Sequence, residues 1–234
     1  MATYYVATVA GGGNDSRTPV QAQSILTPWL TLTHAVPFLA AGDTLFVRAG
    51  TYNESLVNNI PSGSSWANKV RIAQYQSEVV WLAPTSGNHV LYLDGNQQYI
   101  EFDGIGMDGT VGIAYGPVKL RGWTGGNPHH IRIQNATVKG GLGALAEGRV
   151  TILVLAETTG LLGSHEFLKL NVQGVNATGA YATGIYLQTS NSLVSGCQVH
   201  QVRGTGIWIH NPNTATVPNA NTVTATRVFD VVGA

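Results

Sequence analysis

Charge, cysteine and long apolar runs are all scarce in this sequence of 234 residues. Charged residues make up 10% of it, and 12 lysines and arginines balance 12 aspartates and glutamates, so we expect neither nucleic acid nor a membrane as a partner. Cys197 is the single cysteine, which excludes an internal disulfide and predicts a buried thiol. No stretch approaches the roughly 18 apolar residues of a membrane span, and the first residues do not form a secretory signal.

Motifs for metals and phosphates are missing as well. The sequence contains no CxxC and no HExxH, and we therefore predict no metal site. GGGND at 11–15 lacks the lysine of a phosphate loop and is interpreted as a turn. Glycine is abundant instead, with 29 residues, and together with the low charge it favours a turn-rich β protein over a helical one.

What the sequence does contain is an uneven internal repeat. Similar strand-like phrases return about seven times at spacings of 24 to 37 residues, each centred on an apolar residue: Val47, Ile72, Phe102, Ile133, Leu170, Val194 and Val223. Five positions after the last five of these, a second apolar residue follows: Met107, Val138, Val175, Val199 and Val228. Such a repeat is typical of stacked units that cannot bury their own apolar faces, and the constant offset predicts one recurrent bend.

A second set of phrases, such as VLYLDG at 90–95 and GIWIH at 206–210, alternates apolar and polar residues. Aligned, these phrases predict two inward ladders, one of Leu91, Val118, Leu153, Ile185 and Ile207, the other of Leu93, Leu120, Leu155, Leu187 and Ile209. Ladders of this kind are expected where parallel strands lie about 4.8 Å apart. The intervals are too long for hairpins and carry no helical pattern, so we predict an all-β solenoid of about seven coils with two strands in each. A β-sandwich is the alternative.

The first 43 residues differ from the rest and are predicted to cap the solenoid, which occupies 44–234. TYYVATV at 3–9 is predicted to be a strand, and Thr27 is predicted to be the N-cap of a short helix that Pro37 ends early. The final phrase begins a rung with no second strand and no capping helix after it. Three explanations stay open: the chain is truncated, its end stacks on another subunit as a homo-oligomer, or the last valines fold over as a minimal cap.

Several segments carry a resemblance to a known superfamily: TYYVATVAGGGND, TPWLTLTHAV, AGDTLFVRAGTYNES at 41–55, TGIYLQTSNSLVSG and TGIWIH. They are similar to the right-handed parallel β-helix proteins of the pectate-lyase-like superfamily. The resemblance implies that fold, an extracellular or phage-particle location and a polysaccharide partner. It also implies polysaccharide lyase or glycoside hydrolase activity, where a lysine or arginine base stands beside acidic residues that hold calcium. Calcium is expected from the resemblance only, because the sequence has no dense aspartate cluster.

The outward partners of the two ladders are the predicted functional site. They form one column of Tyr92, Lys119, Val154, Tyr186 and Trp208 and another of Asp94, Arg121, Ala156, Gln188 and His210. Because aromatic faces pack against sugar rings, Tyr92, Tyr186, Gln188, Trp208 and His210 are predicted to bind the substrate. The trio of Asp94, Lys119 and Arg121 is predicted to grip a uronate carboxylate or to carry catalysis. The alternative is a cross-strand ion pair worth roughly 0 to 1 kcal/mol.

The first strand of each repeat has its own outward ladder, predicted to contain Arg71, Glu101, Arg132 and Lys169 next to Asp103, Gln134 and Asn171. Its alternating charge is interpreted first as compensation between rungs. A glycosidase pair of Glu101 and Asp103 is the alternative. Taken together, the sequence predicts a carbohydrate-interacting β-helix. The rival class is a non-catalytic structural, adhesive or phage-fibre-type solenoid.

Overall fold

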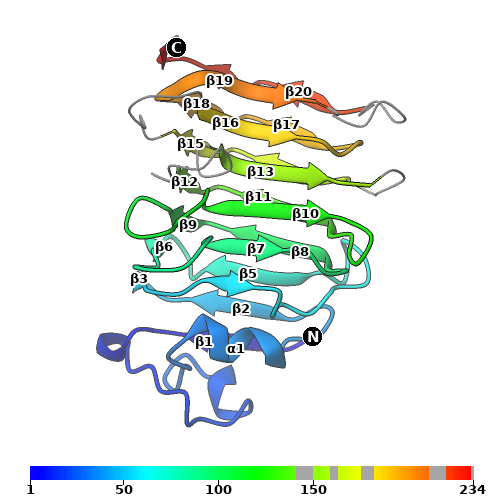
Figure 1. Ribbon diagram of the computed structural model, residues 1–234. Coiled ribbons are helices and arrows are strands. Elements are labelled where there is room, and N and C mark those ends of the chain that lie inside the picture. The colour runs from blue at the N-terminus through cyan, green and yellow to red at the C-terminus, as the bar shows by residue number, and fades with distance from the viewer. Residues whose placement is uncertain (141–149, 159–162, 175–181, 211–219, 233–234) are drawn as a thin grey trace.

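The computed structural model is a column of stacked parallel strands with a short helical segment at its N-terminal end (Figure 1). The structure describes residues 1–140, 150–158, 163–174, 182–210 and 220–232. Within these residues every pairing between named strands is parallel, and the strands form three sheets of eight, seven and seven strands. The all-β parallel solenoid predicted from the sequence is therefore confirmed. The buried apolar side chains fill the space between the three sheets as one continuous core.

After β1, each pass of the chain contributes one strand to each sheet in turn. The first sheet contains β1 (Thr3–Val6), β2 (Thr44–Val47), β5 (Val70–Gln74), β8 (Gln98–Asp103), β11 (His129–Gln134), β14 (Glu166–Leu168), β17 (Leu193–Ser195) and β20 (Thr222–Thr224). The second contains β3 (Gly50–Tyr52), β6 (Val80–Leu82), β9 (Ile105–Asp108), β12 (Thr137–Lys139), β15 (Asn171–Gln173), β18 (Gln198–His200) and β21 (Arg227–Val228). The third contains β4 (Leu56–Val57), β7 (Leu91–Leu93), β10 (Val118–Gly122), β13 (Val150–Ala156), β16 (Ala182–Leu187), β19 (Val202–Ile209) and β22 (Val231–Val232).

The second sheet corrects the prediction of two strands per repeat. Its strands are only two to four residues long, too short to show the alternation by which a strand is recognised in sequence. The predicted recurrent bend separates them from the first sheet. At the bends after β8, β11, β14, β17 and β20 one residue adopts the left-handed conformation, with φ between 49° and 74°: Gly104, Asn135, Lys169, Gly196 and Ala225.

The ladder of the first sheet differs from the prediction at two rungs. Ile72 pairs with Leu45 instead of Val47, and Phe167 instead of Leu170 lies between Ile133 and Val194. The residue five positions after Phe167 is Val172, which pairs with Val138 in the second sheet. The predicted partner Val175 lies outside the described residues.

The third sheet has the predicted register except in β13. Leu91, Val118, Ile185 and Ile207 share one inward ladder, but β13 contributes Ile152 to it where Leu153 was predicted. In the second ladder β13 likewise contributes Val154 instead of Leu155. Because side chains alternate along a strand, this shift of one residue turns Leu153 and Leu155 outward.

The N-terminal segment contains the short helix α1 (Leu32–Ala35) and the 3₁₀ helices η1 (Val9–Gly11), η2 (Gln21–Gln23) and η3 (Val36–Phe38). The predicted N-cap Thr27 is wrong, since the Oγ1 atom of Thr31 accepts the hydrogen bond from the backbone N–H of His34 at 3.2 Å. The carboxylate of Glu54 accepts the N–H groups of Leu32 and Thr33 at 3.1 and 2.8 Å, which satisfies the start of this helix. The α-helix ends before Pro37, as predicted.

The last described rung has strands in all three sheets, which corrects the expectation that the chain ends before a further strand. In β22, Val231 and Val232 pair with Val202 and Arg203 of β19, so they extend the third sheet instead of folding over it. Self-association through this end of the column stays a prediction. In the described part of the chain no helix is both long and apolar enough to cross a membrane.

Candidate functional site

The candidate site is the outward surface of β7, β10, β13, β16 and β19, which we call the third-sheet face. Its position follows from alternation, because the residues between its members belong to the buried ladders. The first outward column contains Tyr92, Lys119, Leu153, Tyr186 and Trp208. The second contains Asp94, Arg121, Leu155, Gln188 and His210, in which Arg121 pairs with Leu155 and the others continue the register of their strands. All eight predicted site residues therefore lie on this one face.

An ion-paired group occupies the half of the face that is nearer the N-terminus. The Nε and Nη2 atoms of Arg121 donate to the two carboxylate oxygens of Glu157, both at 2.7 Å. The Nη1 atom of Arg121 lies 4.0 Å from the Oδ2 atom of Asp94. The hydrogen bond from Arg121 lowers the pKa of Glu157, and the same bond raises the pKa of Arg121. Arg121 therefore keeps its proton and its partner.

Tyr92 and Asp94 complete this group. The hydroxyl of Tyr92 donates to the Oδ2 atom of Asp94 at 2.6 Å, and the side-chain amide of Asn58 donates to the Oδ1 atom. Burial raises the pKa of Tyr92, with a further contribution from the bond to Asp94. The Nζ atom of Lys119 lies 5.8 Å from the centre of the Tyr92 ring, and this lysine is buried with 9% of its surface exposed. The predicted trio is therefore brought together, but as part of a larger paired network.

Three rings form an aromatic cluster at the other end of the face. The ring centres of Tyr186 and Trp208 lie 5.2 Å apart in an edge-to-face arrangement, and His210 lies 5.3 Å from Trp208 and 6.2 Å from Tyr186. The amide of Gln188 donates to the Tyr186 hydroxyl at 2.9 Å. Trp208 is 45% exposed. This cluster offers an apolar ring surface with polar edges, which is the surface that a sugar ring needs.

Leu153 and Leu155 lie between the two parts of the face. The sequence predicted Val154 and Ala156 at these positions, and the shift of β13 by one residue accounts for the difference. Leu153 is buried and Leu155 is half-buried, so the rung between the ion-paired group and the aromatic cluster is aliphatic.

Two residues of this face were missed from the sequence, Glu157 and Trp123. In the correct register Leu153, Leu155 and Glu157 follow one another at every second position, so alternation along β13 would have indicated Glu157. The Trp123 ring centre lies 5.3 Å from the Cζ atom of Arg121, and the indole Nε1 donates to the carbonyl of Asp94 at 2.8 Å. Trp123 also follows Arg121 by two positions, which is the same signal.

The chemistry available here favours binding over proton abstraction. A catalytic base must be deprotonated near neutral pH. Arg121 stays protonated instead, because its hydrogen bond to Glu157 raises its pKa. Calcium does not fit either, because both carboxylates of the face are engaged with Arg121. Across the described ranges, no group of three or more His, Cys, Asp or Glu residues is arranged to hold a metal ion.

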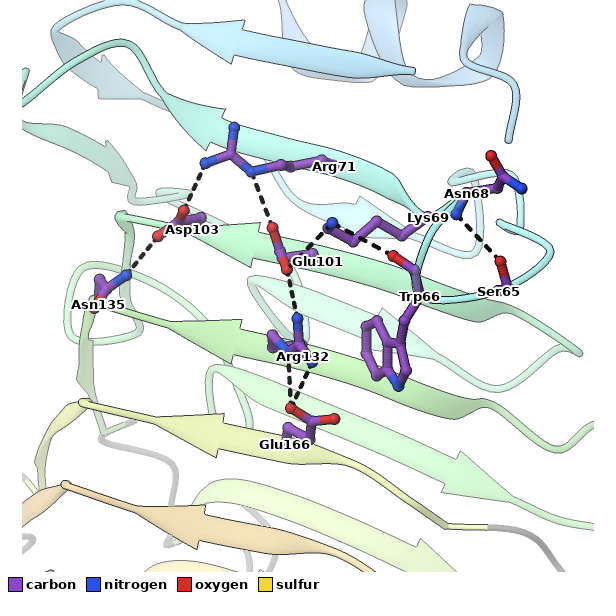
Figure 2. A network of polar contacts seen from close by, with 10 residues as sticks. All are labelled: Ser65, Trp66, Asn68, Lys69, Arg71, Glu101, Asp103, Arg132, Asn135 and Glu166. Carbon is purple, nitrogen blue, oxygen red and sulfur yellow. Dashed lines mark hydrogen bonds and ion pairs between the residues drawn. The ribbon is translucent and has the colours of Figure 1, made fainter. Parts of the chain in front are cut away.

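A second polar network lies on the outer face of the first sheet (Figure 2). Glu101 is 3% exposed and bonds to Arg71 Nε and Arg132 Nη1, both at 2.9 Å, while Lys69 lies 3.9 Å away. The fourth member of this ladder is Glu166, which pairs with Arg132 at 2.8 Å, instead of the predicted Lys169. The charge alternates from rung to rung, as expected of compensation between neighbouring strands.

The remaining members of this network are also held by partners. Asp103 accepts from Arg71 Nη2 at 2.6 Å and from the amide of Asn135 at 2.7 Å. The Cζ atom of Arg132 lies 4.0 Å from the centre of the Trp66 ring (Figure 2). In the position predicted for Asn171 the strand carries Leu168, which pairs with Gln134. This network joins rungs to one another and offers little exposed chemistry.

Comparison with known proteins gives similarity in structure alone. No family model matches the sequence, and no curated protein matches it. Among solved structures the chain is similar to pectate lyase Pel9A, with a TM-score of 0.60 and 14% identity over 97% of this chain and 62% of that one. It is also similar to a protein described as a "putative glycosyl hydrolase" from Parabacteroides merdae ATCC 43184, with a TM-score of 0.55 and 14% identity over 96% of this chain and 95% of that one. At this identity the likeness shows the fold, the parallel β-helix of pectate-lyase-like proteins.

Proposed function

We propose that the protein binds a polysaccharide along the third-sheet face. The observation that carries this proposal is the aromatic cluster of Tyr186, Trp208 and His210, in which Trp208 is 45% exposed although it belongs to a regular strand. A large, exposed aromatic side chain among polar ring edges is a frequent feature of recognition surfaces.

The geometry of a solenoid suits an extended ligand. Neighbouring strands of the third sheet lie about 4.8 Å apart, so a linear polymer laid across them meets one rung after another. In order along the column it would meet Trp208, then Tyr186, then the aliphatic rung, and then the group around Arg121. Such a ligand would therefore pass from aromatic contacts to an aliphatic rung and then to charged contacts.

The structural neighbours give independent support. One is a pectate lyase and the other is described as a glycosyl hydrolase, so both names refer to enzymes that act on carbohydrates. This chain spans 62% of the length of the pectate lyase, and the activity of that whole enzyme is therefore only a proposal for this protein. Between catalysis and binding, the two-bond pairing of Arg121 with Glu157 supports binding, because a guanidinium held in this way is not available as a base.

The experiment compares two alanine variants that remove aromatic rings of similar exposure. Trp208→Ala removes the ring at the centre of the cluster, and Phe38→Ala removes a ring in the N-terminal segment that is 46% exposed. Affinity is measured by calorimetry on a panel of xyloglucan, galactomannan, arabinogalactan, polygalacturonate and alginate. We expect Trp208→Ala to weaken binding about tenfold or more and Phe38→Ala to leave it unchanged.

Assays for unsaturated uronates and for reducing ends run in parallel on the same panel. Product in either assay would show that the protein also cleaves a polysaccharide, at this face or elsewhere. A folded protein that binds no member of the panel would overturn the proposal. Equal losses in the two variants would overturn the assignment of the face.

A further inference from the structure

We infer that the polysaccharide bound by the third-sheet face is uncharged, and this inference rests on the proposed function. It differs from the expectation that Asp94, Lys119 and Arg121 grip a uronate carboxylate. The reason is that the positive charges of the face are already balanced by carboxylates of the protein itself. Among its described residues the face has two cations, Lys119 and Arg121, and two carboxylates, Asp94 and Glu157.

The guanidinium of Arg121 is occupied on the edge that recognises carboxylates. A uronate would use two parallel N–H groups of the arginine fork. Glu157 already accepts from such a pair, Nε and Nη2, with both bonds at 2.7 Å. The remaining edge faces Asp94, whose Oδ2 atom lies 4.0 Å from Nη1. An acidic sugar would have to displace one carboxylate and approach the other.

Lys119 does not supply a spare positive charge to solvent. Its surface is 9% exposed, and its ammonium group lies 5.8 Å from the centre of the Tyr92 ring. Its charge also contributes to the low pKa of Glu157, after the larger effect of Arg121. Glu157 therefore stands beside both cations of the face, and its own side chain is 41% exposed.

What the face offers instead suits hydroxyl groups. The exposed carboxylate of Glu157 is an acceptor for sugar hydroxyls, and the rings of Tyr186 and Trp208 take the apolar faces of pyranose rings. A uronate would meet like charge at Glu157 and Asp94, which selects against it. The face thus prefers a neutral glycan to a polyuronate through the same residues that hold Arg121 in place.

The first test compares ligands that differ in charge and little else. Polygalacturonate and its methyl-esterified form share one backbone, and galactomannan and xyloglucan serve as further neutral probes. We expect the wild-type protein to bind at least one neutral probe, and to bind polygalacturonate at least tenfold more weakly than the methyl ester. Binding of the neutral probe should change less than twofold between 20 and 300 mM NaCl, because no ion pair forms with the ligand.

The second test releases the arginine. Glu157→Gln removes the charge that holds Arg121, and we expect the ratio of polygalacturonate affinity to methyl-ester affinity to rise about tenfold. Glu78→Gln is the matched control, because Glu78 holds Arg48 through a similar pair at 2.8 Å and its loss changes the net charge of the protein by the same amount. The control variant should keep the wild-type ratio.

The outcomes separate this inference from the proposed function. Tighter wild-type binding to polygalacturonate than to the methyl ester would overturn the inference and leave carbohydrate binding intact. Equal shifts in Glu157→Gln and Glu78→Gln would also overturn it, since net charge would then explain the preference. If the folded wild-type protein bound none of the glycans, both the inference and the proposed function would be overturned.

Discussion

His165 is a histidine inside the core of the solenoid. Arg132 pairs with Glu166, so His165, which precedes Glu166, stands next to Ile131, which precedes Arg132. Ile131 in turn pairs with Ile100, and the three residues form one inward ladder. The surface of His165 is 1% exposed, and its Nδ1 atom has no hydrogen-bond partner among the described residues. Burial lowers the pKa of His165 to about 3, with smaller contributions from the nearby His129 and His130. A core position has thus been filled by a group that resists protonation.

This histidine makes stability depend on pH. Between pH 6.5, its ordinary pKa, and pH 3 the unfolded chain takes up a proton that the folded chain does not. The free energy of unfolding should therefore fall as the pH falls through this range, by up to about 1.4 kcal/mol per pH unit. Urea titrations at pH 8, 6, 5 and 4 would measure the slope.

His165→Leu, a variant of similar volume, should show a shallower slope below pH 6.5. His129 and His130 also have lowered pKa values because of burial, so some slope should remain. Above pH 7 the difference between variant and wild type should be constant. Parallel curves at all pH values would contradict the account of His165.

At the scale of elements, the bend between the first and second sheets is the most regular feature of the fold. At the ends of β8, β11, β14, β17 and β20, one left-handed residue follows an inward residue by two positions, from Gly104 after Phe102 to Ala225 after Val223. The backbone N–H of Gly104 donates to the carbonyl of Gln134 in the next coil, and the N–H groups of Asn135, Lys169 and Gly196 donate in the same way. Left-handed backbone costs an L-residue roughly 1 to 2 kcal/mol, and the stacked hydrogen bonds offset that cost at Asn135 and Lys169.

Two exposed bends give a matched pair of substitutions. Gly196→Ala introduces a Cβ that makes only ordinary van der Waals contacts with Lys169, of which the one to Cγ at 3.4 Å is the shortest, so backbone strain at φ of 66° is its main effect. We expect it to lower the free energy of unfolding by roughly 1 to 2 kcal/mol, and Ala225→Gly to raise it by about 1 kcal/mol. Thermal and urea unfolding measure both. Changes of the same sign would contradict the assignment of these bends.

The sequence predicted the register of strands whose two faces differ in polarity, and it failed for a strand whose two faces are both apolar. In β10 and β19 one face is aliphatic and the other polar or aromatic, and their registers were predicted correctly. In β13, VTILVLA is apolar on both faces, so alternation could not choose between Leu153 and Ile152. That one-residue error hid Glu157, the partner of Arg121.

At the scale of the whole molecule, the solenoid places residues that are far apart in the sequence on one face. Tyr92 and Trp208 are 116 positions apart, yet they belong to the same outward column of the third sheet. The sequence could predict most of the residues that share this face, because register follows from the apolar ladders outside β13. It could not predict which charges pair, because ion pairing depends on side-chain conformation and on the corrected position of Glu157.

The five tryptophans provide the most direct measurement of the central claim, that a neutral glycan binds the third-sheet face. Their indole N–H signals are followed by ¹⁵N-resolved NMR while the tightest-binding neutral oligosaccharide of the panel is added. Trp123 and Trp208 lie on the face, whereas Trp29 is buried in the N-terminal segment, Trp66 contacts Arg132 on the outer face of the first sheet, and Trp81 belongs to β6 of the second sheet. We predict that the signals of Trp208 and Trp123 shift and that the other three do not. Shifts confined to Trp66 or Trp81 would contradict the account.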